Sequence, residues 1–212
     1  MAKVHFNSVI AMLVILPALH TEPGEVVTHE LNKDGILDCG LYPSGINDTV
    51  VELAASLETA GYSAQPTSTP MRWKHAKLLS NLVNAAQALI GDVPELGVIA
   101  KAMRAEGEAV LRAKAIDFAT QQEEKDRNQG HFAMGDIKGY PRLGGSTWQS
   151  MTRGTGNVET EWLNGEIVRL GREAGVATPI NTGLVSLMNE ALEVRMPAGS
   201  YGTAALLAKL GL

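Results

Sequence analysis

The chain has 212 residues, of which 45% are hydrophobic and 19% are charged, and its net charge is −5. This hydrophobic fraction is enough for a packed core, and the length allows one large or two modest domains. The negative net charge and the dispersed basic residues argue against binding to nucleic acid or to an anionic membrane surface.

The N-terminal third has the pattern of an α/β unit. Asn47 to Ala60 predicts a helix, because Asn47 is a good N-cap and Gly61 ends the periodic pattern. Before this helix, three stretches bounded by turn residues predict strands, namely residues 8–16, 24–30 and 34–39. From Val9 to Leu16 the first of these is apolar without interruption, which predicts a strand buried in the middle of a parallel sheet.

The first apolar run also has features of a signal peptide, since Lys3 precedes it. Pro17 and the polar residues after it offer no small-residue cleavage site, and the run is too short to cross a bilayer. Cys39 is the single cysteine, which rules out an internal disulfide and suits a reducing compartment. The five histidines show no ligand spacing. We therefore expect a cytoplasmic protein without a metal site.

After a turn-rich connector from Pro66 to Pro70, the pattern becomes helical. Thr178 and Pro179 together predict a helix start, because threonine can cap and proline fits the first turn. The expected helices cover about 72–90, 94–124, 146–153, 157–174, 179–194 and 198–210, with a glycine-rich loop at 135–145. The sequence thus predicts an α/β domain over residues 1–70 and an all-α domain over residues 71–212.

A polar stripe runs along the first of these helices. With Lys77 at zero and about 100° per residue, Asn81 falls at about 40° and Asn84 at about 340°. A solvated helix face is the simple interpretation. Asparagine is unfavourable inside a helix, however, so two of them beside a lysine suggest hydrogen bonding to something else.

Glu159 occupies an unusual position on the helix predicted from residue 157. The same projection places it on the side of Leu163 and Leu170. A carboxylate on an apolar face is costly unless it is paired, which makes Lys77 a candidate partner. The alternative is that Glu159 lies in the first turn after Asn157, where free N–H groups and the helix dipole favour an acidic residue.

Several segments of the sequence, taken in order along the chain, resemble segments of a known protein family. Their order and spacing resemble the C-terminal helical domain of the ketopantoate reductase (2-dehydropantoate 2-reductase) family, and Pro17–Val26 resembles late strands of that family's nucleotide-binding domain. The helical segments are Lys77-x-x-x-Asn81, Ser146–Gln149, Glu159–Gly165 and Gly175–Asn181. The resemblance implies an α/β remnant of a Rossmann-like domain followed by an all-α C-terminal domain.

The resemblance also implies a reaction, the NADPH-dependent reduction of the 2-keto acid ketopantoate to pantoate in pantothenate and coenzyme A biosynthesis. Lys77 matches the family's catalytic lysine, which donates a proton or hydrogen bond to the carbonyl oxygen. Glu159 matches the glutamate that orients this lysine, and Asn81 and Ser146 match substrate-binding positions. A fixed cation suits this chemistry, because it stabilises the developing alkoxide.

The chain departs from the family pattern at two positions. Family members carry a second asparagine four residues after the first, where this chain has Ala85, so Asn84 is the available substrate-binding residue. The stretch from Ser146 to Glu159 is one residue longer than the common pattern. Thr147 is therefore an alternative to Ser146 for the hydroxyl that binds substrate.

A third departure is the absence of a Gly-x-Gly-x-x-Gly motif, which lets a pyrophosphate approach the backbone. The nearest string, Gly154–Glu159, lacks the third glycine and follows a polar loop. The family's Asn-Gly loop near the nicotinamide is also missing, since Asn7 is followed by Ser8. The chain resembles a family member without roughly the first third.

A predicted sheet that lacks its first strands suggests that another chain pairs with it. In a parallel sheet without its earlier strands, residues 9–16 would present an unpaired apolar edge. We expect the chain to pair with a separate nucleotide-binding chain, to form a homo-oligomer, or to be a fragment with little activity. Two other functions remain open, a non-catalytic helical dimerisation or binding module and a reductase of another small 2-keto acid. The sequence does not distinguish NADPH from NADH.

Overall fold

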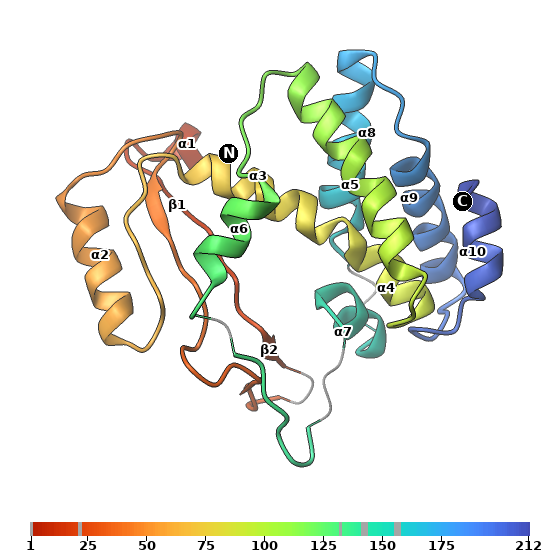
Figure 1. Ribbon diagram of the computed structural model, residues 1–212, viewed down its shortest axis with the longest axis horizontal. Helices are drawn as coiled ribbons and strands as arrows, with labels where there is room; N and C mark the ends of the chain where they lie inside the picture. The colour runs from red at the N-terminus through yellow and green to blue at the C-terminus, as the bar shows by residue number, and fades with distance from the viewer. Residues whose placement is uncertain (1, 21–22, 132, 141–143, 155–157) are drawn as a thin grey trace. The chain divides into compact units, whose positions relative to one another are not determined.

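The computed structural model describes residues 2–20, 23–131, 133–140, 144–154 and 158–212 (Figure 1). The chain forms two compact units. Unit 1 comprises Met1–Lys77 and Asp117–Arg142, and unit 2 comprises Leu78–Ile116 and Leu143–Leu212. Residues 117–142 therefore belong with the N-terminal segment, an association that a single boundary at residue 70 does not describe.

Unit 1 contains short strands and a few helices. Its elements are α1 (Ala2–His5), β1 (Ile10–Met12), β2 (Ala18–Leu19), β3 (Val27–Thr28), β4 (Cys39–Leu41), α2 (Asp48–Thr59), α6 (Gln121–Asn128) and most of α3 (Pro70–Asn81). β1 pairs with β4, with Ala11 opposite Gly40, and β2 pairs with β3, with Ala18 opposite Thr28. Both pairs are antiparallel, so the expectation that the first strand lies in a parallel sheet is wrong.

Parallel pairing does occur on the other side of β4. Isolated parallel bridges join Ile36 to Ser63 and Cys39 to Pro66. Helix α2 lies between these partners in the sequence and supplies the crossover that parallel neighbours require. The α/β character predicted from the sequence therefore resides in the segment from residue 36 to residue 66.

The core of unit 1 lies between α2 and the β1–β4 sheet. Cys39, Val50, Ala54 and Ala64 are buried there. Helix α2 begins as predicted, since Asn47 Oδ1 accepts a hydrogen bond from the Val50 amide at 3.1 Å, and Gly61 follows it with a φ of +104°.

The apolar run at residues 8–16 is only partly buried. Ala11 and Leu13 are buried, whereas Val14 and Leu16 are exposed, so the prediction of a fully buried strand is wrong for its second half. Alternate residues of a strand point to opposite faces, and only one face is covered over this stretch.

A buried ion pair fastens α6 to the sheet of unit 1. Arg127 Nη2 donates to Asp38 Oδ1 at 2.6 Å, and Arg127 Nε donates to Asp38 Oδ2 at 2.7 Å. Arg127 also reaches Ser63 Oγ at 3.1 Å. Both charged side chains are more than nine-tenths buried. Because a buried charge is costly unless it is paired, this contact keeps α6 against the residue that precedes β4.

Unit 2 is all-α. It contains α4 (Val83–Ile90), α5 (Leu96–Ala113), α7 (Ser146–Thr152), α8 (Thr160–Ala174), α9 (Pro179–Glu193), α10 (Thr203–Leu210) and the end of α3. Helix α8 packs on α5 and α9, α4 packs on α5, α7 and α9, and α10 packs on α9 (Figure 1). The largest fully buried side chains of this unit are Leu82, Leu89, Ile99, Met103, Val110, Leu111, Ile167, Leu184, Met188 and Leu206. The all-α C-terminal part is confirmed.

Two of the predicted helices are interrupted. The helix expected at 72–90 is divided at Leu82 into α3 and α4. The helix expected at 94–124 ends at Ala113, and Thr120 then caps α6. Thr120 Oγ1 accepts from the Glu123 amide at 3.2 Å, and the Glu123 carboxylate accepts from the Thr120 amide at 2.9 Å. This Thr-x-x-Glu capping box is visible in the sequence, so the boundary was predictable.

Helix α9 begins at Pro179 as predicted, but Thr178 is not its side-chain cap. Glu106 of α5 serves instead, since its carboxylate accepts from the amides of Ile180 at 2.8 Å and Asn181 at 3.0 Å. Asn157, the predicted cap of the preceding helix, lies outside the described residues. Within the described parts of the chain, no helix is long and apolar enough to cross a membrane.

Candidate functional site

Polar side chains of α4 meet the backbone that leads into α7. The Gly145 amide donates to Gln87 Oε1 at 2.8 Å. A Cβ atom placed on Gly145 would lie 3.2 Å from Asn84 Oδ1 and 3.4 Å from Gln87 Oε1. The absence of a side chain at this glycine therefore lets the start of α7 approach both amides closely.

The next residue, Ser146, contacts the start of α8. Ser146 Oγ donates to Glu159 Oε2 at 3.2 Å, and both side chains are exposed. Three of the residues singled out in the sequence thus lie around the start of α7, since Asn84 lies beside Gly145 and Ser146 contacts Glu159. We refer to Asn84, Gln87, Ser146 and Glu159 as the polar cluster.

Glu159 does not lie on the apolar face of α8, as the helical projection suggested. The helix begins at Thr160, and Glu159 is the N-cap residue, whose carbonyl accepts from the amides of Trp162 and Leu163, each at 2.9 Å. A projection that assumes a helix from residue 157 therefore assigns the wrong direction to this side chain. The exposed carboxylate needs no buried cation, and its observed partner is Ser146.

Ser146 and Thr147 differ in their surroundings. Ser146 is exposed, whereas Thr147 is 1% exposed and its hydroxyl oxygen has no hydrogen-bond partner among the described residues. Of the two hydroxyls, only that of Ser146 can reach a ligand without a rearrangement of α7.

Lys77 and Asn81 lie on α3, one helical turn apart, and both are half-buried. Lys77 is the last residue of the first segment of unit 1, whereas Asn81, Ser146 and Glu159 belong to unit 2. The pairing of Lys77 with Glu159 stays a prediction.

A buried asparagine that the sequence reasoning missed connects α8 to the interruption at Leu82. Asn164 has no exposed surface, and its Nδ2 donates to the Leu82 carbonyl at 3.1 Å and to Asn181 Oδ1 at 3.0 Å. Asn181 in turn donates to Glu106 Oε2 at 2.7 Å. Asn164 lies one turn before Ile167 on the buried face of α8, a spacing that could have revealed its burial.

Gln87 was also missed. It lies three residues after Asn84 in a short helix that is otherwise apolar from Ala85 to Ile90, and this isolated polar position is the available signal. Its carbonyl oxygen holds the Gly145 amide, so it positions the backbone beside Ser146.

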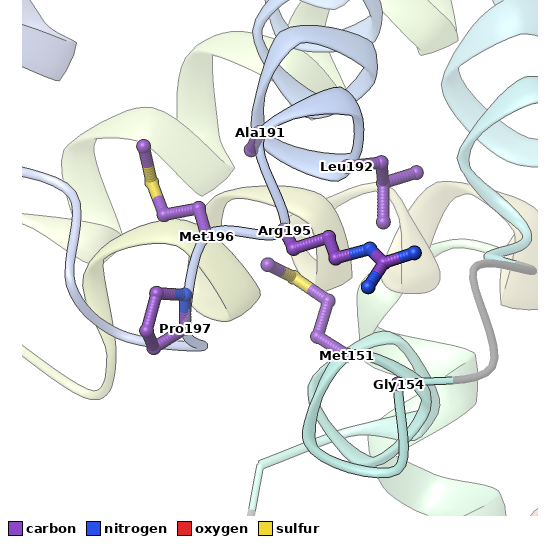
Figure 2. A pocket seen from close by; sticks show the side chains of 7 residues that line it. All are labelled: Met151, Gly154, Ala191, Leu192, Arg195, Met196 and Pro197. Atoms are coloured by element: carbon purple, nitrogen blue, oxygen red, sulfur yellow. The ribbon is translucent and has the colours of Figure 1, made fainter.

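A hollow of about 540 Å³ lies elsewhere in unit 2, between the C-terminal ends of α7 and α9 (Figure 2). It is lined by Met151, Gly154, Ala191, Leu192, Arg195, Met196 and Pro197. None of the residues of the polar cluster lines it, and neither do Lys77 and Asn81.

The sequence offers no glycine-rich turn for the pyrophosphate of a dinucleotide. The sequence has no Gly-x-Gly-x-x-Gly turn, and the string that begins at Gly154 continues into residues 155–157, which lie outside the described residues. Within the described parts, His, Cys, Asp and Glu side chains form no group of three that could hold a metal ion.

The sequence matches a known family over its helical part. Residues 70–192 match the family described as ketopantoate reductase PanE/ApbA C terminal. The chain belongs to this family. The matched region contains the polar cluster together with Lys77 and Asn81, so the family resemblance of these segments is confirmed.

Full-length relatives support this assignment. The 2-dehydropantoate 2-reductase of Pyrococcus horikoshii is 26% identical over an alignment of 179 residues, which covers 81% of this chain and 56% of that protein. The crystal structure of 2-dehydropantoate 2-reductase from Methylococcus capsulatus is 26% identical with a TM-score of 0.71, covering 96% of this chain and 68% of that one. The chain therefore spans little more than half the length of the curated ketopantoate reductase.

A more distant structure shares only the fold. The complex of D-mandelate dehydrogenase with NADH is 18% identical to this chain, with a TM-score of 0.68, and the match covers 87% of this chain and 62% of that one. The α/β remnant followed by a helical domain is thus the architecture of a wider group of proteins.

Proposed function

We propose that this chain binds a small 2-keto acid, with ketopantoate as the first candidate, and supplies the proton for its NADPH-dependent reduction. The observation that carries the proposal is the contact between Ser146 and Glu159 at 3.2 Å, beside Gly145, whose surroundings include the Asn84 side chain. Ser146 and Glu159 lie in segments that resemble the family, and Asn84 is the asparagine available in place of the family's second one.

In this proposal the substrate is held at two adjacent groups, the carboxylate and the ketone. Asn81, Asn84 and Ser146 donate hydrogen bonds to the substrate carboxylate, and the ammonium of Lys77 donates to the ketone oxygen. The proton of Lys77 passes to this oxygen as negative charge develops on it, since a positioned acid and a fixed cation both lower the barrier. Glu159 orients the ammonium, and its exposed carboxylate at the N-cap of α8 is accessible for this role.

The proposal assigns to this chain only the keto-acid side of the reaction. Its residues do not fit a pyrophosphate, so NADPH, or NADH as the alternative, is assigned to a nucleotide-binding part that these residues do not form. A separate nucleotide-binding chain would meet that need. The buried thiol of Cys39 suits a reducing compartment such as the cytoplasm.

A non-catalytic binding module is the second candidate function, and the missing glycine motif favours it. Such a module would keep the helical domain and the keto-acid site without turnover. The two candidates share ligand binding and differ in catalysis, so separate measurements of binding and of NADPH oxidation distinguish them.

The decisive experiment combines both measurements. Ketopantoate is titrated calorimetrically into the full chain, and NADPH oxidation is then followed after addition of a nucleotide-binding polypeptide. We expect Lys77→Ala to abolish oxidation while the far-ultraviolet circular dichroism stays helical, because alanine is a better helix former than lysine. Lys74→Ala is the matched control, since Lys74 lies on the same helix and donates to the Met12 carbonyl.

Three outcomes of this experiment distinguish the candidate functions. Binding and oxidation that both survive in the Lys77→Ala protein would remove the lysine from the mechanism. Binding without oxidation in the wild-type chain would favour the non-catalytic module. Absence of ketopantoate binding in the wild-type chain, together with binding of another 2-keto acid from a panel, would identify a reductase of a different substrate.

A further inference from the structure

The hollow between α7 and α9 has the size and lining of a small-molecule site. Its volume of about 540 Å³ falls within the roughly 300–1,000 Å³ that is common for such sites. Figure 2 shows Met151 extending from the α7 side toward Arg195, with Leu192 and Met196 on the α9 side. Most of the lining is aliphatic or thioether, and methionine side chains adapt to ligands of irregular shape.

The wall on the α9 side is held by backbone hydrogen bonds. The Met196 amide donates to the Ala191 carbonyl at 2.8 Å, and the Arg195 amide donates to the Leu192 carbonyl at 3.1 Å. Further along, the Gly199 amide donates to the Ala88 carbonyl at 2.9 Å, which fixes the loop to α4. The α9 side of the hollow is therefore held in place by the backbone of the chain itself.

Arg195 gives the hollow a charge. Its backbone is left-handed, with a φ of +51°, at the position after a helix where glycine is usual. Ala115 has a similar φ of +52° after α5, so a left-handed residue after a helix does not by itself indicate a ligand site. The signal is a guanidinium beside an apolar lining that contains no acidic residue, and within the described residues Arg195 has no ion pair or side-chain hydrogen bond.

We propose that this hollow binds a small amphipathic carboxylate, with the carboxylate on Arg195 and an aliphatic tail against Met151, Leu192 and Met196. A single guanidinium matches one carboxylate through two parallel hydrogen bonds. A phosphate dianion would leave charge uncompensated, because the lining holds no second cation. The site shares no residue with the proposed keto-acid site and does not depend on the proposed function.

The test uses octanoate, below its micelle concentration, as the probe. It is titrated into the full chain by calorimetry, alongside octanol, which lacks the charge, and acetate, which lacks the tail. We expect saturable octanoate binding, with octanol and acetate at least about tenfold weaker, since a hydrogen bond to a charged group contributes roughly one to two factors of ten. The methyl signals of Met151 and Met196 should shift in the same titration.

Variants locate the carboxylate. Arg195→Gly removes the guanidinium and keeps the left-handed turn, so octanoate should bind at least about tenfold more weakly while the unfolding temperature stays the same or rises. Arg172→Gln, on exposed α8 surface outside the hollow, should leave binding unchanged. The proposal is overturned if wild-type chain shows no saturable octanoate binding, if octanol binds as tightly, or if Arg195→Gly binds octanoate normally.

Discussion

Substitution of Asn164 by leucine tests the link between α8 and the α3–α4 junction. The change removes two donors, to the Leu82 carbonyl at 3.1 Å and to Asn181 Oδ1 at 3.0 Å. Each acceptor left unsatisfied in the core costs roughly 1–3 kcal/mol. The substitution also removes the Asn164 carbonyl oxygen, which is buried and has no partner among the described residues. Removing this unsatisfied acceptor regains about as much stability as one of the two lost hydrogen bonds costs. The net loss should be roughly 1–3 kcal/mol.

Urea unfolding followed by circular dichroism measures this loss as a lower midpoint at unchanged slope. Asn189→Leu is the matched control, because Asn189 is exposed on α9 and bonds Glu161 at 3.0 Å. Its effect should stay within about 0.5 kcal/mol. Equal stability of the Asn164→Leu and Asn189→Leu proteins would refute the reasoning that buried hydrogen bonds hold α8 on the junction.

Three further predictions concern other parts of the molecule. The pKa of Glu123 is lowered from 4.5 to about 2, chiefly by the Arg72 hydrogen bond, so its stabilisation is complete above pH 4.5 and is lost as the pH falls toward 2. Glu123→Gln should flatten the decline of unfolding temperature in this window, and parallel declines would contradict it. Burial raises the pKa of the Cys39 thiol, so a thiol reagent should react slowly with native protein and rapidly in urea; equal rates would contradict its burial. Gly145→Ala should weaken ketopantoate binding severalfold in calorimetry because its Cβ crowds Asn84 Oδ1, whereas Gly97→Ala, with open space around its Cβ, should not; equal affinities would contradict the proposed site.

Local patterns predicted the elements whose determinants lie close together in the sequence. The cap of α2 by Asn47, its end before Gly61 and the start of α9 at Pro179 all depend on residues within one or two turns. Long-range determinants were not predictable in this way. Glu106 caps a helix more than seventy residues away, and Arg127 meets Asp38 across 89 positions, because packing and not periodicity brings them together.

The candidate site divides in the same way. Ser146 and Glu159 were identified because their segments resemble a family, and the structure brings them into contact at 3.2 Å. Of the two interpretations of Glu159, the position on an apolar face is wrong and the position at the helix N-terminus agrees with the structure, because α8 begins at Thr160 and Glu159 is its N-cap residue. Gln87 and Asn164 were missed because their partners are a backbone amide and a backbone carbonyl of other segments, which no side-chain pattern reveals.

A structure of the chain with ketopantoate bound tests the central claim most directly, because it locates the substrate relative to residues of both units. The account predicts the ketone oxygen within about 3 Å of Lys77 Nζ, with Glu159 Oε on the far side of the ammonium and the substrate carboxylate against Asn84 and Ser146. Ketopantoate bound away from Ser146, or a Lys77 ammonium that does not reach the ketone, would contradict it.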